Sequence, residues 1–177
     1  MLKCLLSLTL ILTLSFGFAQ NNQLVELRKE YIEALHDCEE AERVYDIFLA
    51  VENPTGKMLA YRGALEAIMT KTTWNLFKKI NYLNKSEASF HKAIEKAPND
   101  VEIRFMRMAV QYEIPEYLGY SEDMEEDRKF IVKNIDNFDP ATLEHETLAE
   151  ILGFMEKCNR FTPDQIEKFK GILALNK

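Results

Sequence analysis

Proline and glycine constrain this chain more than any other residue type, because both interrupt regular secondary structure. The 177 residues include only five prolines and six glycines. Every proline falls between segments whose apolar residues recur at three- and four-residue spacing, where a helix can begin or end but cannot continue. The five are Pro54, Pro98, Pro115, Pro140 and Pro163. This pattern predicts an all-α fold of about eight helices in antiparallel pairs.

The segment from Leu24 to Phe48 leaves two interpretations open. Its apolar residues keep one unbroken heptad rhythm, which is typical of a single long helix. Asp37 followed by Glu40, in contrast, has the form of a capping box that starts a second helix and makes the segment a hairpin.

Capping residues predict where the later helices begin. Asn99-Asp100 precedes a helix from Val101 to Tyr112, for which the alternation of its first apolar residues leaves a strand as the alternative. Three further helix starts are predicted at Ser121–Asp123, Asp139-Pro140 and Thr162-Pro163.

The first twenty residues, MLKCLLSLTLILTLSFGFAQ, have the layout of a secretory signal peptide. Lys3 precedes an apolar stretch from Leu5 to Phe16, and Gly17 and Ala19 occupy the -3 and -1 positions of a cleavage site. We therefore expect residues 1–19 to be cleaved and residues 20–177 to form a single helical domain, with a retained N-terminal anchor as the alternative.

The charge of the mature chain limits its partners. The full chain has 22 basic and 29 acidic side chains, and residues 1–19 hold one lysine and no acid, so cleavage changes the net charge from -7 to -8. This acidity argues against a surface built for nucleic acid or for anionic lipid. No stable membrane insertion is expected once the signal peptide is cleaved. Cys38 and Cys158 remain, and two separate buried thiols are favoured over a disulfide between them.

Two stretches resemble the second helix of a tetratricopeptide repeat, in which small, aromatic, small and proline residues follow at fixed spacing. One stretch matches all four positions, with Ser86, Phe90, Ala93 and Pro98. The other, with Ala41, Tyr45, Phe48 and Pro54, matches the first two. Gly63 is the candidate glycine of a first helix, with an insertion around Trp74 to Ile80. The resemblance covers Leu24 to about Asn137 and implies a degenerate α-solenoid.

The middle of the chain, EIRFMRMAVQYEIPEYLGYSEDMEEDRKFI, also resembles small exported helical proteins of Gram-negative bacteria. That resemblance implies export through the inner membrane to the periplasm or beyond, and it implies no reaction.

Motifs for catalysis, cofactors and metals are missing from the sequence. His145-Glu146 begins like a zinc-binding helix, but Ala149 stands where the second ligand is required. The acidic run from Glu122 to Asp127 lacks the alternation and the glycine of a calcium loop, and a solvated first helical turn explains it better. We therefore expect neither an enzyme nor a bound cofactor or metal.

Six residues are candidates for partner binding. Arg104 and Arg107 share one helix face, and Asp127 lies on the next helix. These three residues form either a structural ion-pair network or a groove for a partner's carboxylate. Trp74, Phe77 and Tyr117 lie in aromatic-rich segments that serve either as binding anchors or as packing between helices. Trp74 is the strongest candidate for a partner contact, because it lies in a connection rather than on a periodic face.

These observations favour an exported, non-enzymatic adaptor or scaffold that binds a protein or peptide across stacked helix pairs. The alternatives are a carrier of a small apolar ligand, an enzyme whose site is assembled from distant helices, and an accessory structural domain.

Overall fold

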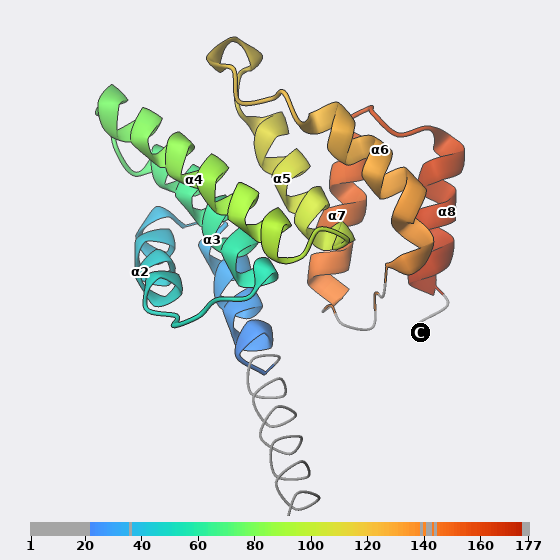
Figure 1. Ribbon diagram of the computed structural model, residues 1–177, viewed down its shortest axis with the longest axis horizontal. Helices are drawn as coiled ribbons and strands as arrows, with labels where there is room; N and C mark the ends of the chain where they lie inside the picture. Colours follow the sequence, from blue (N-terminus) through green and yellow to red (C-terminus); the bar gives the residue numbers. More distant parts are fainter. Residues whose placement is uncertain (1–21, 36, 139, 141–142, 144, 175–177) are drawn as a thin grey trace, which may run out of the picture.

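The structure is a computed structural model that describes residues 22–35, 37–138, 140, 143 and 145–174. All regular secondary structure in this part of the chain is helical, with eight α-helices and no strand, so the all-α prediction is confirmed (Figure 1). The α-helices are residues 22–34, α2 (Cys38–Leu49), α3 (Gly56–Ile68), α4 (Leu76–Lys96), α5 (Val101–Glu113), α6 (Met124–Asn134), α7 (His145–Lys157) and α8 (Pro163–Ala174). Three 3-10 turns accompany them: η1 (Met69–Lys71), η2 (Glu116–Leu118) and η3 (Ile135–Asn137). The predicted signal peptide lies outside the described residues.

The segment from Leu24 to Phe48 forms two helices, so the single long helix is wrong. Asp37 is the N-cap of α2, and its Oδ1 accepts hydrogen bonds from the backbone N–H groups of Glu39 at 2.8 Å and Glu40 at 3.3 Å. The cap satisfies donors that have no partner within the helix. Apolar residues of both helices then pack against α3 in one core.

Two other predicted helix starts are confirmed. The Asp100 carboxylate caps α5 by accepting from the backbone N–H of Ile103 at 3.3 Å, so the strand alternative for this segment is wrong. Thr162 and Gln165 cap α8 reciprocally. The Gln165 backbone N–H donates to Thr162 Oγ1 at 3.3 Å, and the Thr162 N–H donates to Gln165 Oε1 at 3.1 Å.

The predicted start of a helix at Asp139-Pro140 is wrong, because α7 begins at His145. Between them the Leu143 backbone N–H donates to the Pro140 carbonyl at 3.0 Å and closes a single turn. Phe138 and Leu143 are buried in the same core as Phe105. Both side chains are therefore anchored in this core before α7 begins at His145. Residue 139 lies outside the described part of the chain.

Consecutive helices pack against each other along the chain. The most extensive contacts are those of α3 with α4 and of α5 with α6, and α7 packs on α8 (Figure 1). α3 also contacts α2 and α5, so it lies between neighbouring helices on both sides. Gly63 lets α3 and α4 approach closely, since a Cβ there would lie 3.1 Å from the Phe90 ring and 3.2 Å from the Ser86 carbonyl.

Apolar side chains form three clusters along this array. One joins helix 22–34 with α2 and α3, the second joins α3 with α4 and α5, and the third joins α5 with α6, α7 and α8. The third is rich in aromatic contacts, and the ring centroids of Phe105 and Phe169 lie 5.5 Å apart. Because α5 contributes to two clusters, it connects the two halves of the fold.

Cys158 is a free thiol in the third core, so it forms no disulfide. Its Sγ donates to the Met155 carbonyl at 3.5 Å. The side chain of Cys38 lies outside the described part of the structure.

Candidate functional site

Arg104, Arg107 and Asp127, which the sequence groups together, bind one another between α5 and α6. Arg107 Nε donates to Asp127 Oδ2 at 2.6 Å, and Arg107 Nη2 donates to Oδ1 at 2.7 Å. Arg104 Nη1 donates to the same Oδ1 at 2.9 Å. The Asp127 side chain has 0% exposure. These groups are therefore engaged with each other rather than presented to a partner, as expected for a structural ion-pair network.

Two more carboxylates complete this cluster. Arg104 Nη1 also lies 2.8 Å from Glu126 Oε1, and Arg107 Nη1 lies 3.1 Å from Asp123 Oδ2. Burial by itself lowers the pKa of Arg107, but hydrogen bonds and charges from Asp127 and Asp123 outweigh burial and raise it. The acidic run is therefore only partly solvated, since Asp127 is buried while Glu126 is exposed.

A cleft opens between α4 and α5 beside this cluster. Its apolar surface comes from Leu83, Phe90, Val110 and Ile114, and its polar surface comes from Ser86, Glu87, His91, Arg107, Gln111, Tyr120 and Asp123. This small cleft thus joins an apolar surface to carboxylate, amide and imidazole groups.

Gln111 gives the cleft an unused hydrogen-bond acceptor. Its Nε2 donates to Asp123 Oδ2 at 3.0 Å, which fixes the orientation of the amide. Its Oε1 is buried and accepts no hydrogen bond from any residue in the described part of the chain. A buried acceptor without a donor is costly, so this oxygen favours a bound N–H or O–H group.

Tyr120 closes one side of the cleft. Its hydroxyl donates to Asn84 Oδ1 at 2.6 Å, which fastens the connection between α5 and α6 to α4. Burial, with a smaller contribution from the charge of Glu87, raises the pKa of Tyr120. The hydroxyl therefore stays protonated at neutral pH and remains a donor.

The aromatic candidates lie apart from the arginine cluster. Trp74 is 98% exposed and Phe77 is 87% exposed where α4 begins, and Tyr117 is 86% exposed in η2. Trp74 and Phe77 are therefore close in the chain and share one exposed end of α4, whereas Tyr117 belongs to a different connection. Tyr82, by contrast, packs edge-on against Tyr45 with ring centroids 6.3 Å apart.

A second buried ion-pair network joins helix 22–34 to α3 and α5, and the sequence did not predict it. Arg28 Nη2 lies 2.9 Å and 2.8 Å from the two carboxylate oxygens of Glu102. The Tyr61 hydroxyl donates to Glu102 Oε1 at 2.8 Å, and Lys57 Nζ lies 2.6 Å from Oε2. Although burial raises the pKa of Glu102, the charges of Lys57 and Arg28 outweigh it and hold that pKa below its ordinary value.

Glu66 is a third buried carboxylate, placed between α2, α3 and α4. It accepts hydrogen bonds from Ser89 Oγ at 2.6 Å and from the Tyr45 hydroxyl at 3.3 Å. Arg62 Nε lies 3.8 Å away, which is too long for a hydrogen bond. Burial raises the pKa of Glu66, and the hydrogen bond from Ser89 and the charge of Arg62 offset only part of that effect.

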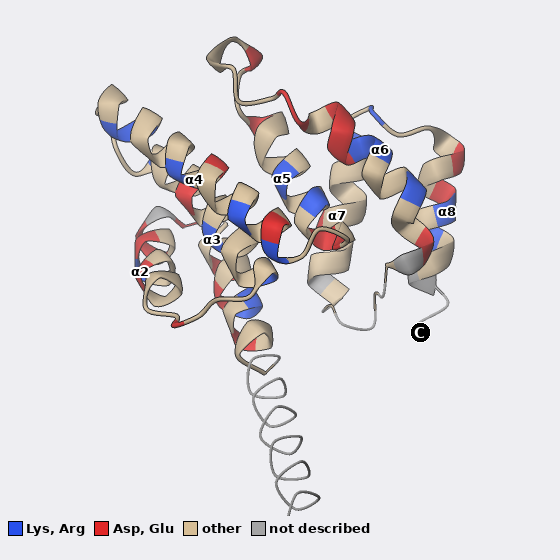
Figure 2. Cartoon of the chain, viewed as in Figure 1, with Lys and Arg blue, Asp and Glu red and all other residues tan. Residues whose placement is uncertain are grey.

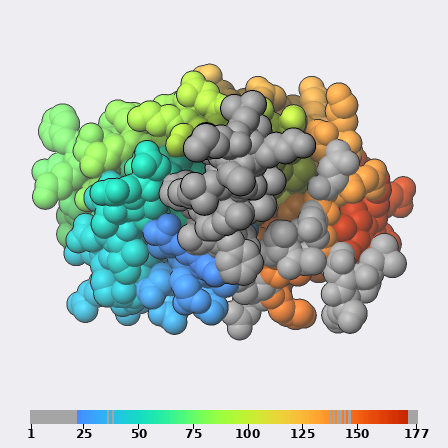
Figure 3. All heavy atoms as spheres, turned by 60° about the horizontal axis from the view of Figure 1, so that its bottom comes forward, coloured from blue at the N-terminus to red at the C-terminus, as the bar shows by residue number. Residues whose placement is uncertain are grey.

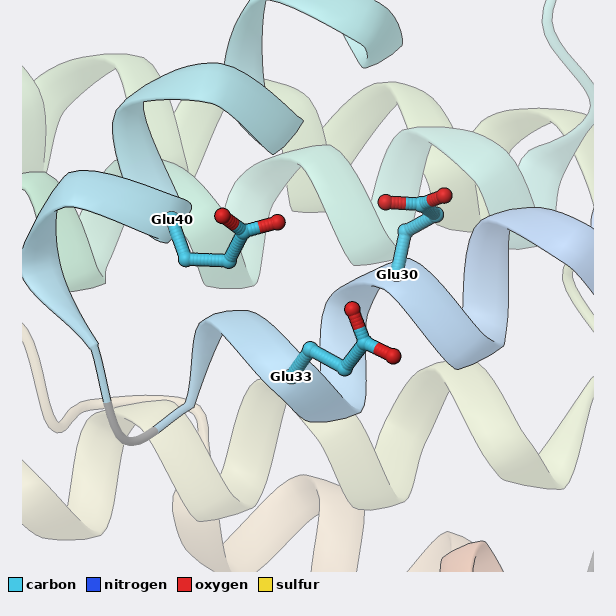
Figure 4. A group of neighbouring side chains, drawn as sticks. All are labelled: Glu30, Glu33 and Glu40. Carbon is cyan, nitrogen blue, oxygen red and sulfur yellow. The ribbon is translucent and has the colours of Figure 1, made fainter.

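Glu30, Glu33 and Glu40 come close together between helix 22–34 and α2 (Figure 4). One carboxylate oxygen from each lies within 4.8 Å of the others. Arg43 forms ion pairs with Glu30 and Glu40, so a cation of the chain itself already neutralises part of this group. Such acidic groups are common on solvated helix surfaces and do not by themselves indicate a metal site.

Comparisons with protein-family models, curated proteins and solved structures find no match. Conclusions about function therefore depend on the geometry given above. Within the described ranges, no helix has the length and apolar character needed to cross a lipid bilayer.

Proposed function

We propose that this protein is an exported helical-repeat adaptor that binds a segment of a protein or peptide partner in the cleft between α4 and α5. The unpartnered Oε1 of Gln111 is the observation that carries this proposal. A peptide supplies an N–H donor for this oxygen, and an apolar side chain of the peptide contacts the half-buried Val110 and Ile114.

The packing of the helices supports the repeat-like part of the proposal. α3 packs on α4, α5 on α6 and α7 on α8, as in an array of helix pairs. In a tetratricopeptide repeat, a glycine of the first helix lies close to the second helix. Gly63 of α3 lies in the same way close to Phe90 and Ser86 of α4. The longer spacing between Gly63 and Phe90 is taken up by the additional first turns of α4.

The buried carboxylates favour an adaptor over an enzyme. Asp127, Glu102 and Glu66 are all engaged by arginine, tyrosine or serine side chains inside the helix packing. An acid or base in catalysis must reach the substrate, so carboxylates used in this way stabilise the fold instead. Glu87 and His91 line the α4–α5 cleft from exposed positions, where a partner can contact them.

Affinity capture from the envelope fraction tests the proposal. The cleft variant combines Glu87→Ala and His91→Ala, two exposed positions one turn apart on α4. Its matched control combines Lys92→Ala and Glu95→Ala, which are exposed on the same helix but do not line the cleft. We expect a partner that wild type and control retain and the cleft variant loses. Retention by all three proteins contradicts the assignment to the cleft.

Export has a separate test. N-terminal sequencing of the protein recovered from the envelope is expected to begin at Gln20, after cleavage behind Ala19. A recovered chain that still begins at Met1 contradicts the signal peptide.

A further inference from the structure

The start of α4 extends beyond the helix on which it packs. α4 has 21 residues and α3 has 13, so at about 1.5 Å per residue α4 is longer by roughly 12 Å. The first buried side chain of α4 is Leu83, and residues 76–82 are exposed or half-buried. This end of α4 projects at the edge of the molecule (Figure 3). Residues 71–79 are called the α4 tip below.

The α4 tip concentrates exposed apolar surface. Trp74 is almost fully exposed, and Leu76 and Phe77 are 67% and 87% exposed. These are three of the five large exposed hydrophobic side chains among the described residues, and they lie within four positions of the chain. Isolated exposed apolar residues are common, but a cluster of this kind indicates an interaction surface.

The tip is basic although the chain is acidic. Residues 67–86 contain four lysines, Lys71, Lys78, Lys79 and Lys85, and no aspartate or glutamate. The segment therefore carries +4, which leaves -11 on the rest of a chain whose net charge is -7. Figure 2 shows basic residues and no acidic ones at the beginning of α4. Within the described residues, Lys71, Lys78 and Lys79 form no ion pair.

We propose that the α4 tip docks this protein on the surface of a membrane that contains anionic phospholipid. Trp74 and Phe77 enter the boundary between headgroups and acyl chains, where amphipathic aromatic rings are favoured. Lys78 and Lys79 lie beside them and contact lipid phosphates, and each lysine near such a surface strengthens binding by about fivefold. The docking is peripheral and needs no membrane-spanning helix.

Charge complementarity favours this occupant over a protein or a second copy of the chain. The acidic remainder of the molecule is repelled by an anionic surface, so the tip is the part that approaches it. A second copy presents three lysines to three lysines at the same tip, which opposes a symmetric contact. Lipid headgroups, in contrast, rearrange around a convex tip and need no matching shape.

Trp74 reports directly on this contact, because it is the only tryptophan of the chain. The full chain is titrated with vesicles of phosphatidylcholine alone and of phosphatidylcholine mixed with phosphatidylglycerol. We expect the Trp74 emission to shift to shorter wavelength with the mixed vesicles and to be quenched by lipids brominated on their acyl chains. Added salt weakens the response, because it screens the lysines.

Variants that keep Trp74 separate the apolar contribution to vesicle binding from the electrostatic one. Phe77→Ala and the pair Lys78→Glu with Lys79→Glu are each expected to weaken vesicle binding by about tenfold or more. Tyr117→Ala is the aromatic control, since Tyr117 is 86% exposed in a connection flanked by Glu113, Glu116 and Glu122. Lys92→Glu with Lys133→Glu is the charge control at exposed sites elsewhere. Residues 1–19 are the same in all variants, so they cannot cause a difference in vesicle binding between one variant and another.

Four results overturn the proposal. The first is an unchanged Trp74 emission with anionic vesicles, and the second is an equal response to phosphatidylcholine alone. The third is an equal loss of binding in the control variants. The fourth is a shift that depends on protein concentration without lipid, which identifies a second copy as the occupant. If membrane docking is overturned, the proposal of partner binding in the α4–α5 cleft still stands, because the tip and the cleft use different residues.

Discussion

Arg107 binds both carboxylate oxygens of Asp127 across the contact between α5 and α6. Nε lies 2.6 Å from Oδ2 and Nη2 lies 2.7 Å from Oδ1, and the carboxylate is fully buried. Arg104 shares the same carboxylate, so one acidic group pairs with two guanidinium groups inside the helix packing. The same arginine lines the cleft to which we assign partner binding, so the network that stabilises the helices also forms one wall of the cleft.

Replacing the shared carboxylate is expected to destabilise the fold strongly. Asp127→Asn leaves the charges of Arg104 and Arg107 without their buried partner, which costs about 3–5 kcal/mol. Glu126→Gln is the control, because Glu126 contacts Arg104 but is 67% exposed, and such pairs contribute less than about 1 kcal/mol. Urea unfolding at neutral pH measures the free energy of unfolding of both variants. Equal losses of stability contradict the role of Asp127 as the buried carboxylate that both arginines share.

Glu102 is expected to make stability depend on acid. Its folded-state pKa lies below 4.5, because Lys57 and Arg28 outweigh the effect of burial. The stability it contributes is therefore present above its unfolded pKa and is lost as pH falls through the lowered folded pKa. Glu102→Gln is expected to lower the unfolding free energy by about 3–5 kcal/mol at neutral pH. Unfolding measured across the acidic range should show this difference shrinking, and a difference independent of pH counts against the network.

Glu66 is expected to show the opposite dependence. Burial raises its folded-state pKa above 4.5, so its contribution to stability is present below the unfolded pKa and is lost as pH rises through the folded pKa. Glu66→Gln should gain stability relative to wild type as pH rises from about 4 to about 7. Paired urea titrations measure this trend, and a change of the reverse sign shows that the hydrogen bonds from Ser89 and Tyr45 dominate instead.

Gly63 tests the close approach of α3 and α4. Gly63→Ala places a Cβ 3.1 Å from the Phe90 ring, and the crowding is expected to cost about 1–3 kcal/mol. Gly153 in α7 is the matched control, since a Cβ there meets no atom within 4 Å. Gly153→Ala should stabilise by about 0.5–1 kcal/mol, because alanine is the better helix former. Thermal unfolding compares the two, and a stabilised Gly63→Ala protein excludes the tight contact.

Local signals in the sequence predict much of this fold. Asp37, Asp100 and Thr162 cap helices because capping depends on residues only two or three positions away. The contact between Arg107 and Asp127 can also be predicted from the sequence, because the two residues lie on consecutive helices. The start of α7 does not follow from such local signals, because the chain before it is tied to the core by the buried side chains of Phe138 and Leu143.

Other features depend on contacts that no local pattern reveals. Arg28 and Glu102 are 74 positions apart, and each looks like an ordinary surface charge on its own helix. The unused acceptor of Gln111 follows from burial in the cleft between α4 and α5 rather than from any motif. The basic character of the α4 tip follows from its three lysines, but the negative net charge of the whole chain conceals it. Its exposure follows only from the different lengths of α3 and α4.

Photocrosslinking from inside the cleft tests the central claim most directly. A benzoylphenylalanine residue is placed at His91, on the rim of the α4–α5 cleft, or at Lys92, the next residue, which is exposed but does not line the cleft. Irradiation of the cell envelope is expected to give a discrete protein adduct from position 91 and none from position 92. Absence of an adduct at position 91, or the same adduct from both positions, contradicts partner binding in this cleft.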